Sequence, residues 1–162
     1  MHKNSDFLSL MRQKPDATAM LWGSSEYRNL MGTVYFYHAP EGVVVMAQIS
    51  GLPKNSDLCA KPVFGFHIHS GRSCTGNNED AFADAINHYN PQGCPHPYHA
   101  GDMPPLFGCG GYAFSTFLTD RFTIDEIIGR VVIVHSSPDD FTTQPSGNAG
   151  KKIACGIINS IR

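Results

Sequence analysis

Closely spaced histidines give the first sign of chemistry in this sequence. His67 and His69 lie two residues apart in the segment 65–69, which reads GFHIH. In an extended strand, side chains two residues apart point to the same side, so both imidazoles share one face while Phe66 and Ile68 share the other. The apolar face is suited to a core. The other face offers two neighbouring imidazole nitrogens, an arrangement that copper and zinc ions accept.

Further side chains of the metal-binding type follow along the chain: His88, His96, His99, Asp102 and His135. The last of them ends the apolar run 131–134. Two isolated histidines on a strand are more often solvated or hydrogen-bonded than bound to metal. Six histidines and an aspartate in one β-rich chain favour a metal site instead.

An all-β scaffold is predicted to position these side chains. Runs rich in β-branched and aromatic residues alternate with turns such as 39–42, where Gly42 can take a positive φ. Strands joined in this way favour an antiparallel sandwich or barrel over βαβ units. The predicted strands are 17–22, 31–37, 43–49, 64–69, 112–118, 131–135 and 153–158, with a short bridge at 124–128 and a helical turn or ordered lead-in within 1–16.

Two long segments interrupt this pattern, residues 71–107 and 136–150. The first carries five prolines in its second half, so it cannot keep regular structure for long. Loops of this length inside a compact domain are usually functional or disordered. The ligand-type residues within them favour a function.

The whole-chain composition excludes several classes of protein. A length of 162 residues suits one domain spanning 1–162. The net charge is −2 and no basic run occurs, so neither a nucleic-acid partner nor a membrane-surface role is supported. No apolar stretch approaches the roughly 18 residues of a membrane span. The first residues do not form a secretory signal, which predicts a cytoplasmic protein, or an exported one whose leader has been removed. Five cysteines would ordinarily suggest export, but their number does not settle the location of this chain.

The sequence resembles the copper/zinc superoxide dismutase family from about residue 51 to residue 162. Five motifs carry the resemblance, in the order in which the family has them: 65–69 (GFHIH), 88–91 (HYNP), 99–102 (HAGD), 128–135 (IGRVVIVH) with PDD at 138–140, and 147–150 (GNAG) followed by 153–157 (IACGI). The resemblance implies a Greek-key β-sandwich or flattened barrel of about eight antiparallel strands, with the two long loops forming the metal site.

The family's ligands can be carried over residue by residue. The resemblance implies a copper ion held by His67, His69, His88 and His135, and a zinc ion held by His88, His96, His99 and Asp102. His88 would then serve both ions as an imidazolate. Nitrogen donors suit Cu(II) and Zn(II), and a set of three histidines and one aspartate suits a structural zinc site. Asp139 matches the aspartate that accepts hydrogen bonds from a ligand of each ion, here His67 and His96, while Asp140 is expected to be a turn residue.

The resemblance also implies an activity, the dismutation of superoxide to dioxygen and hydrogen peroxide, with His88 and Lys152 as catalytic residues. Lys152 stands where the family has an arginine, so the positive charge is kept and the planar fork is lost. Since the chain is negative overall, Lys152, with Lys151 and Arg72, is expected to attract the superoxide anion. The alternative is a copper- and zinc-binding protein for storage or delivery with little turnover. The oligomeric state stays open, and a homodimer is allowed.

The cysteines give three further expectations. Cys74 and Cys155 match the family disulfide. Cys94 and Cys109 lie on either side of residues 96–102, which carry His96, His99 and Asp102 and are called the zinc segment here. This segment is shorter than the family's. The two cysteines either form a bond that closes it or remain separate thiols. Cys59 is expected to be a free, packed thiol. Trp22 and the phenylalanines are expected in the core.

Overall fold

The computed structural model describes residues 6–60 and 62–161. Its elements are α1 (Phe7–Leu10), β1 (Ala17–Gly23), β2 (Met31–Ala39), β3 (Gly42–Ser50), β4 (Val63–Phe64), β5 (Phe66–His69), the 3-10 helix η1 (Ala83–Ala85), β6 (Leu106–Phe107), β7 (Tyr112–Thr119), α2 (Ile124–Ile127), β8 (Val131–His135) and β9 (Lys152–Ser160). The all-β prediction is confirmed. The segment predicted as a short bridge contains the helix α2.

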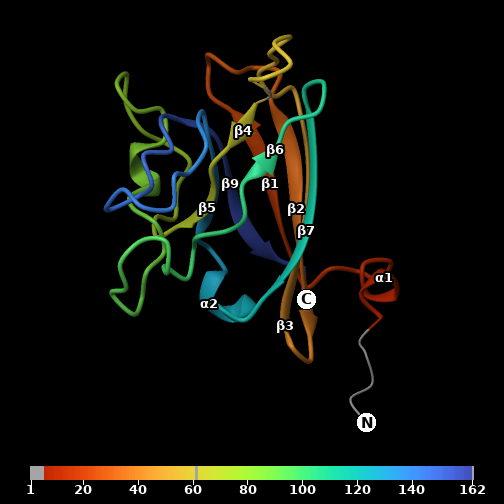
Figure 1. The fold of residues 1–162 in the computed structure, drawn as a ribbon. Coiled ribbons are helices and arrows are strands. Elements are labelled where there is room, and N and C mark those ends of the chain that lie inside the picture. The colour runs from red at the N-terminus through yellow and green to blue at the C-terminus, as the bar shows by residue number, and fades with distance from the viewer. Residues whose placement is uncertain (1–5, 61, 162) are drawn as a thin grey trace.

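Seven of the strands form one curled antiparallel sheet in the order β5-β8-β9-β1-β2-β3-β7 (Figure 1). The strands β4 and β6 form a second, two-stranded sheet. Only Gly65 separates β4 from the edge strand β5, and β6 precedes the other edge strand β7. Pairing of β4 with β6 therefore brings the two edges of the curled sheet toward each other.

The turn between β2 and β3 shows how the sequence fixes the register. Ala39 pairs with Gly42, and Gly42 adopts the predicted positive φ of 143°. A Cβ atom on Gly42 would lie 2.4 Å from the carbonyl oxygen of Thr119, so a larger residue would disturb the pairing of β3 with β7. The tight turn sets the alternation of inward and outward side chains along both strands.

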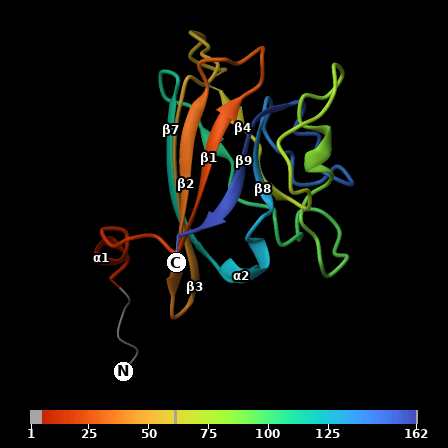
Figure 2. The same ribbon diagram turned by 180° about the vertical axis from the view of Figure 1, so that it is seen from behind.

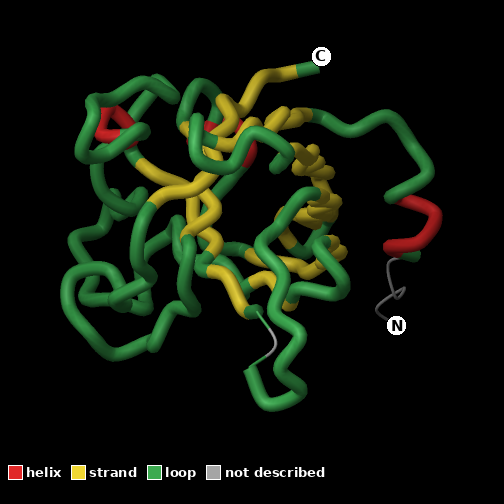
Figure 3. The backbone as a smooth tube through the Cα atoms, turned by 90° about the horizontal axis from the view of Figure 1, so that it is seen from above, coloured by secondary structure: helices red, strands yellow, loops and turns green. Residues whose placement is uncertain are grey.

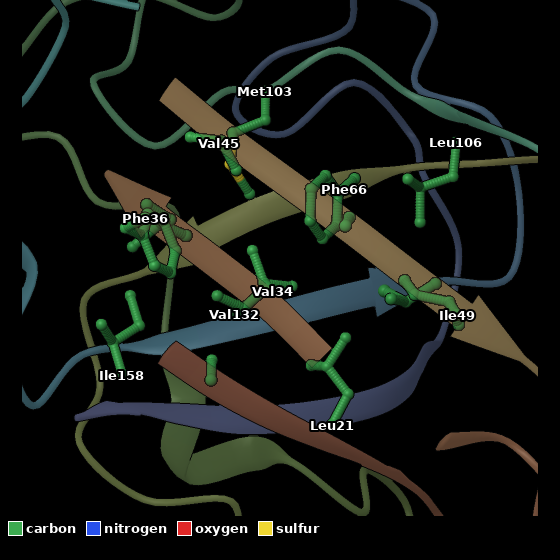
Figure 4. Close-up of a cluster of buried hydrophobic side chains, with 14 of the residues drawn as sticks. Leu21, Val34, Phe36, Val45, Ile49, Phe66, Met103, Leu106, Val132 and Ile158 are labelled. Carbon is green, nitrogen blue, oxygen red and sulfur yellow. The ribbon is translucent and has the colours of Figure 1, made fainter. Parts of the chain in front are cut away.

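The core fills the inside of the curled sheet. Apolar side chains from opposite strands meet there, among them Leu21, Val34, Phe36, Val45, Ile49, Phe66, Met103, Leu106, Val132 and Ile158 (Figure 4). Phe66 and Ile68 are fully buried on this side of β5, as predicted. His67 and His69 are also buried, on the opposite face of the strand.

Two long loops cover that opposite face. The first long loop comprises residues 70–105 and the second comprises residues 136–151, and both lie beside β5 and β8 (Figures 1 and 2). Seen from above, the loops gather on one side of the strands (Figure 3). They enclose the histidines in a space that the strands alone would leave open to water.

Some sequence-based expectations about burial are wrong. Trp22 is 56% exposed, and Phe107, Phe114 and Phe141 are exposed too. Trp22 and Phe114 lie on the outer face of the sheet because side chains alternate along β1 and β7, and aromatic type does not show which face a residue takes. Cys59 is exposed in the loop that follows β3, so the packed thiol was also predicted wrongly.

The predicted helical turn near the N-terminus is present as α1, while residues 1–5 lie outside the described part of the chain. Phe7, Leu10 and Met11 pack against Tyr37 and Val44 on the outer face of the sheet. Within residues 6–60 and 62–161, no helix has the length and apolar character needed to span a membrane.

The predicted disulfide between Cys74 and Cys155 is present and ties the first long loop to β9. It packs against Phe82, Val131 and Ile133. The two cysteines are 81 residues apart, and closing a loop of this length stabilises a fold by about 4–5 kcal/mol in the chain-entropy treatment.

We therefore predict that the double substitution Cys74→Ala and Cys155→Ala lowers the free energy of unfolding of the metal-free protein by about 4 kcal/mol. Denaturant titration of metal-free protein measures this without a contribution from bound ions. Cys59→Ala is the matched control, and it should change the free energy by less than about 0.5 kcal/mol because Cys59 is exposed. Equal effects of the two changes would contradict the stabilising role of the bond.

Candidate metal centre

Strand pairing brings three of the histidines together. β5 and β8 are antiparallel neighbours, with His67 opposite Ile133. His135 lies two residues after Ile133, so it points to the same side of the sheet as His67 and His69. The Nε2 atoms of His69 and His135 are 3.2 Å apart.

The second nitrogens of these two rings fix where their protons are. Nδ1 of His69 donates to the carbonyl oxygen of Ile86 at 3.0 Å, and Nδ1 of His135 donates to that of Gly150 at 3.3 Å. Burial lowers the pKa of His69 well below its usual value and that of His135 to about 3, so both rings are neutral near pH 7. Each Nε2 therefore presents a lone pair, and two lone pairs face each other at a distance where a cation is needed between them.

His88 comes to the same place from the first long loop. The loop is bonded to β5 beside it, because the N–H of Tyr89 donates to the carbonyl oxygen of Ile68 at 2.8 Å. Nδ1 of His88 donates to Oδ1 of Asp102 at 2.7 Å, while its Nε2 is buried with no hydrogen-bond partner. Its ring centre lies 4.0 Å from that of His67. The predicted copper residues thus offer donor atoms within 4.8 Å of one another: His67, His69, His88 and His135.

The predicted zinc residues form a second group. Donor atoms of His88, His96, His99 and Asp102 also lie within 4.8 Å of one another. Nδ1 of His96 and Nδ1 of His99 are 3.0 and 3.3 Å from Oδ2 of Asp102. Both nitrogens are nevertheless buried without a hydrogen bond, because their geometry to Asp102 is wrong for one. Atoms that converge without bonding each other are suited to share one ion.

Asp139 connects the two groups. Its Oδ2 accepts from Nε2 of His67 at 2.7 Å, and its Oδ1 accepts from Nε2 of His96 at 2.8 Å. Burial alone would raise the pKa of Asp139, but the hydrogen bonds from His67, the Phe141 N–H and His96 lower it. The carboxylate therefore stays ionised, and both histidines keep the proton on Nε2 and leave Nδ1 free for an ion. Asp140 accepts from the N–H groups of Thr142 and Thr143, as expected of a turn residue.

A glycine in the GNAG motif makes room for this connection. Gly147 has a φ of 70°, and a Cβ atom there would lie 2.2 Å from Oδ1 of Asp139 and 2.6 Å from Nε2 of His96. Any larger residue would therefore collide with the hydrogen bond between Asp139 and His96.

The two groups fit copper and zinc by an observation independent of sequence. In the part of the chain that the structure describes, four buried histidine nitrogens have no hydrogen-bond partner: Nδ1 of His67, Nε2 of His88, Nδ1 of His96 and Nδ1 of His99. A buried polar atom without a hydrogen bond costs about 1–3 kcal/mol, and proteins rarely leave several together. Ions bound to these nitrogens would remove that cost, and neutral imidazoles with one carboxylate are ligands that Cu(II) and Zn(II) accept.

The short zinc segment is held from outside by two residues that the sequence patterns did not indicate. Gln144 pairs with the backbone of His96: it accepts from the His96 N–H at 2.9 Å and donates to the His96 carbonyl oxygen at 2.7 Å. Nη1 of Arg121 donates to the carbonyl oxygens of Pro97 at 2.9 Å, His99 at 3.3 Å and Asp102 at 3.2 Å. No local motif marks either residue, since they contact the segment from 48 and 19–24 residues away.

A disulfide does not close this segment. Cys94 and Cys109 are both free, so of the two alternatives for this pair the separate thiols are the one found. The backbone of each cysteine has other partners. The side chain of Asn90 bonds both the N–H and the carbonyl oxygen of Cys94, and the backbone of Cys109 pairs with that of Tyr112, the first residue of β7.

The predicted cations lie in different surroundings. Lys152 lines a cleft of about 1060 Å³ together with His69, His88 and His135, but its Nζ donates to Oδ2 of Asp80. Lys151 also lines the cleft; its side chain is 72% exposed, and its Nζ lies 4.0 Å from Oε2 of Glu26. Arg72 lies over the backbone of Gly129 and, among the described residues, is not part of the cleft lining.

Comparison with known proteins relates this chain to copper/zinc superoxide dismutases. A family model described as "Copper/zinc superoxide dismutase (SODC)" matches residues 30–158. "Superoxide dismutase [Cu-Zn] 2" of Aquifex aeolicus (strain VF5) is 31% identical over 144 residues, which cover 80% of this chain and 79% of that protein. "Superoxide dismutase [Cu-Zn]" of Legionella pneumophila is 30% identical over 158 residues, which cover 93% and 91%.

A solved structure agrees with these relatives. The crystal structure of a double mutant of a SOD-like protein from Bacillus subtilis superimposes with a TM-score of 0.71 at 26% identity, and the match covers 88% of this chain and 97% of that one. The family match spans most of the chain, and two groups of ligand-type side chains meet inside the same fold. The chain therefore belongs to the copper/zinc superoxide dismutase family.

Proposed function

We propose that this protein catalyses the dismutation of superoxide at a copper ion held by His67, His69, His88 and His135, next to a zinc ion held by His88, His96, His99 and Asp102. The observation that carries the proposal is the convergence of unshared lone pairs in the first group, above all the two Nε2 atoms of His69 and His135 at 3.2 Å. The family relationship supports the same activity.

A copper ion in that group would supply the one-electron chemistry, because it can alternate between Cu(II) and Cu(I) as one superoxide is oxidised to dioxygen and the next is reduced to hydrogen peroxide. The chain's own residues orient the donors and handle protons. His88 lines the cleft and belongs to the copper group, and its Nε2 has no hydrogen-bond partner among the described residues, so this nitrogen is free to hold a proton for the product when no ion is bound to it.

The other nitrogen of His88 has a separate task. Its Nδ1 proton lies on the hydrogen bond to Asp102, and a zinc ion in the second group would replace that proton. Asp139 keeps His67 and His96 in the tautomer that each ion requires. Gln144 and Arg121 hold the backbone that carries the zinc ligands.

One observation favours the alternative of copper storage or delivery with little turnover. The ammonium of Lys152, which would attract the anion, is bonded to Asp80. Full ligand groups with a neutralised cation at the cleft are what a storage protein could also have. Activity must therefore be measured together with metal content.

We predict about one copper and one zinc per chain after refolding with both ions, and superoxide decay that is faster than in buffer. Elemental analysis and stopped-flow absorbance on the same sample measure both quantities. A protein with both ions in full and decay no faster than in buffer would contradict dismutation and favour storage.

Replacing the shared ligand should affect both ions. His88→Ala is expected to weaken copper and zinc binding together, each by more than about tenfold. Competition with chelators of known affinity measures each constant. His38→Ala is the control, since His38 is exposed on β2 and belongs neither to the two ligand groups nor to the lining of the cleft. Loss of only one ion in His88→Ala would show that His88 is not shared.

The hydrogen bonds from Arg121 to the zinc segment give a separate prediction. Arg121→Met should lower zinc affinity about tenfold and leave copper affinity almost unchanged, because among the described residues the guanidinium of Arg121 donates to the backbone of the zinc segment. Arg28→Met is the matched control: Arg28 bonds the carbonyl oxygen of Ser25 in the loop between β1 and β2. Zinc affinities that fall equally in both variants would contradict the role of Arg121 in holding the zinc segment.

A further inference from the structure

An ion pair crosses the cleft that leads to the copper residues. Lys152 is the first residue of β9, and Asp80 lies 72 residues earlier in the first long loop. Nζ of Lys152 donates to Oδ2 of Asp80, and both residues line the cleft with His69 and His135. The motifs shared with the family include neither Asp80 nor a carboxylate near it.

The carboxylate of Asp80 is fixed in place by its own loop. Its Oδ1 accepts from the N–H of Phe82 at 3.0 Å. Its backbone N–H donates to Oδ1 of Asn77 at 3.0 Å, and its carbonyl oxygen accepts from the N–H groups of Asn77 at 2.9 Å and Ala83 at 3.1 Å. The turn thus presents Oδ2 toward Lys152, and the pair does not depend on two freely moving side chains.

The lysine is the more enclosed partner. The side chain of Lys152 is 15% exposed, against 38% for Asp80. A lysine side chain with so little access to water is stabilised by a counter-ion, and separating the two charges would cost free energy. The ion pair also has an effect on Asp80: burial would raise the pKa of this carboxyl, but the hydrogen bond from Lys152 lowers it, so Asp80 stays ionised.

The remaining cations of the cleft are engaged as well. Lys151 is near Glu26, and Arg130 donates to the carbonyl oxygen of Ser70 and lies over the ring of Tyr89. Lys152 is the cation next to the copper residues, since it pairs with His135 across β8 and β9. Its pairing with Asp80 therefore decides how positive the inner end of the cleft is.

We propose that Asp80 determines the anion affinity of the copper site by holding the ammonium of Lys152 in an ion pair. A small anion that enters the cleft meets a neutral pair and must compete with Asp80 for Lys152. The inference rests on the proposed function in so far as superoxide is the anion concerned, but it applies to any small anion that binds at the copper ion.

The first test is the affinity of azide, an anionic ligand of Cu(II), titrated by absorbance on protein loaded with copper and zinc. Asp80→Asn removes the competing charge at nearly constant shape. Azide should bind about two- to fivefold more tightly, because the ammonium of Lys152 is then free to pair with the anion in a partly hydrated site. The gain should shrink as salt is added, because screening acts over about 10 Å at 0.1 M.

A neighbouring acid provides the matched control. Glu79→Gln makes the same change of charge one residue away, in the same cleft, on an exposed side chain for which the described residues give no bond to Lys152. Its effect on azide should be clearly smaller. In a Lys152→Met background, Asp80→Asn should lose most of its effect, because the two residues act as a pair. Equal effects of Asp80→Asn and Glu79→Gln, or an unchanged effect in the Lys152→Met background, would overturn the proposal.

A second measurement needs neither metal nor turnover. Acetylation of Lys152 by an anionic amine reagent, sulfosuccinimidyl acetate, is followed in metal-free protein by peptide mass spectrometry, with the exposed Lys151 as the internal reference. Lys152 should react about threefold faster in Asp80→Asn and at the unchanged rate in Glu79→Gln. An unchanged rate in Asp80→Asn would overturn the ion pair itself. If both tests succeed and superoxide decay is not catalysed, the inference stands and the proposed function fails.

Discussion

Asp139 accepts one hydrogen bond from a residue of each ligand group, and the rest of the centre depends on this double contact. His67 comes from β5 and His96 from the first long loop, while Asp139 belongs to the second long loop. A single carboxylate thus joins the strand and both loops. It also decides the chemistry of the two rings, because a proton fixed on Nε2 leaves Nδ1 as a lone pair aimed away from Asp139. The same contact explains why position 147 is a glycine, since a larger residue would collide with Asp139 and His96.

The fold keeps this arrangement dry. The histidines of both groups are buried, and burial lowers the pKa of His67, His69, His99 and His135. The imidazoles are therefore neutral and can bind an ion, and several of their buried nitrogens have no hydrogen-bond partner among the described residues. The disulfide and the hydrogen bonds of Gln144 and Arg121 hold the loops over this cluster. The metal-free state is therefore organised in advance, at the expense of unsatisfied nitrogens that ions would satisfy.

The sequence predicted those parts of the structure that follow from local periodicity or from motifs. Alternation along 65–69 placed His67 and His69 on one face, and the resemblance indicated the disulfide and the residues that meet in each ligand group. Contacts made by single side chains across long separations could not be predicted. Asp80, Arg121 and Gln144 carry no motif, and each acts on a segment that is distant in sequence.

Two other outcomes have different physical causes. Trp22 was expected in the core with the phenylalanines, but the alternation of side chains along β1 places it on the outer face. Cys94 and Cys109 flank the zinc segment in sequence, and this left a bond and two separate thiols equally open. Flanking positions say nothing about where the backbone directs each thiol, and both backbones are held by other partners.

The central claim is that His88 belongs to both ligand groups and would connect the two ions. Electron paramagnetic resonance tests it most directly, on protein loaded with one equivalent of Cu(II) before and after one equivalent of Co(II) is added. Cobalt accepts the tetrahedral ligands that zinc prefers and carries unpaired electrons. If His88 bridges the ions, the spins couple through its ring and the Cu(II) signal should largely disappear. An unchanged Cu(II) signal, with both metals shown to be bound by elemental analysis, would contradict the account.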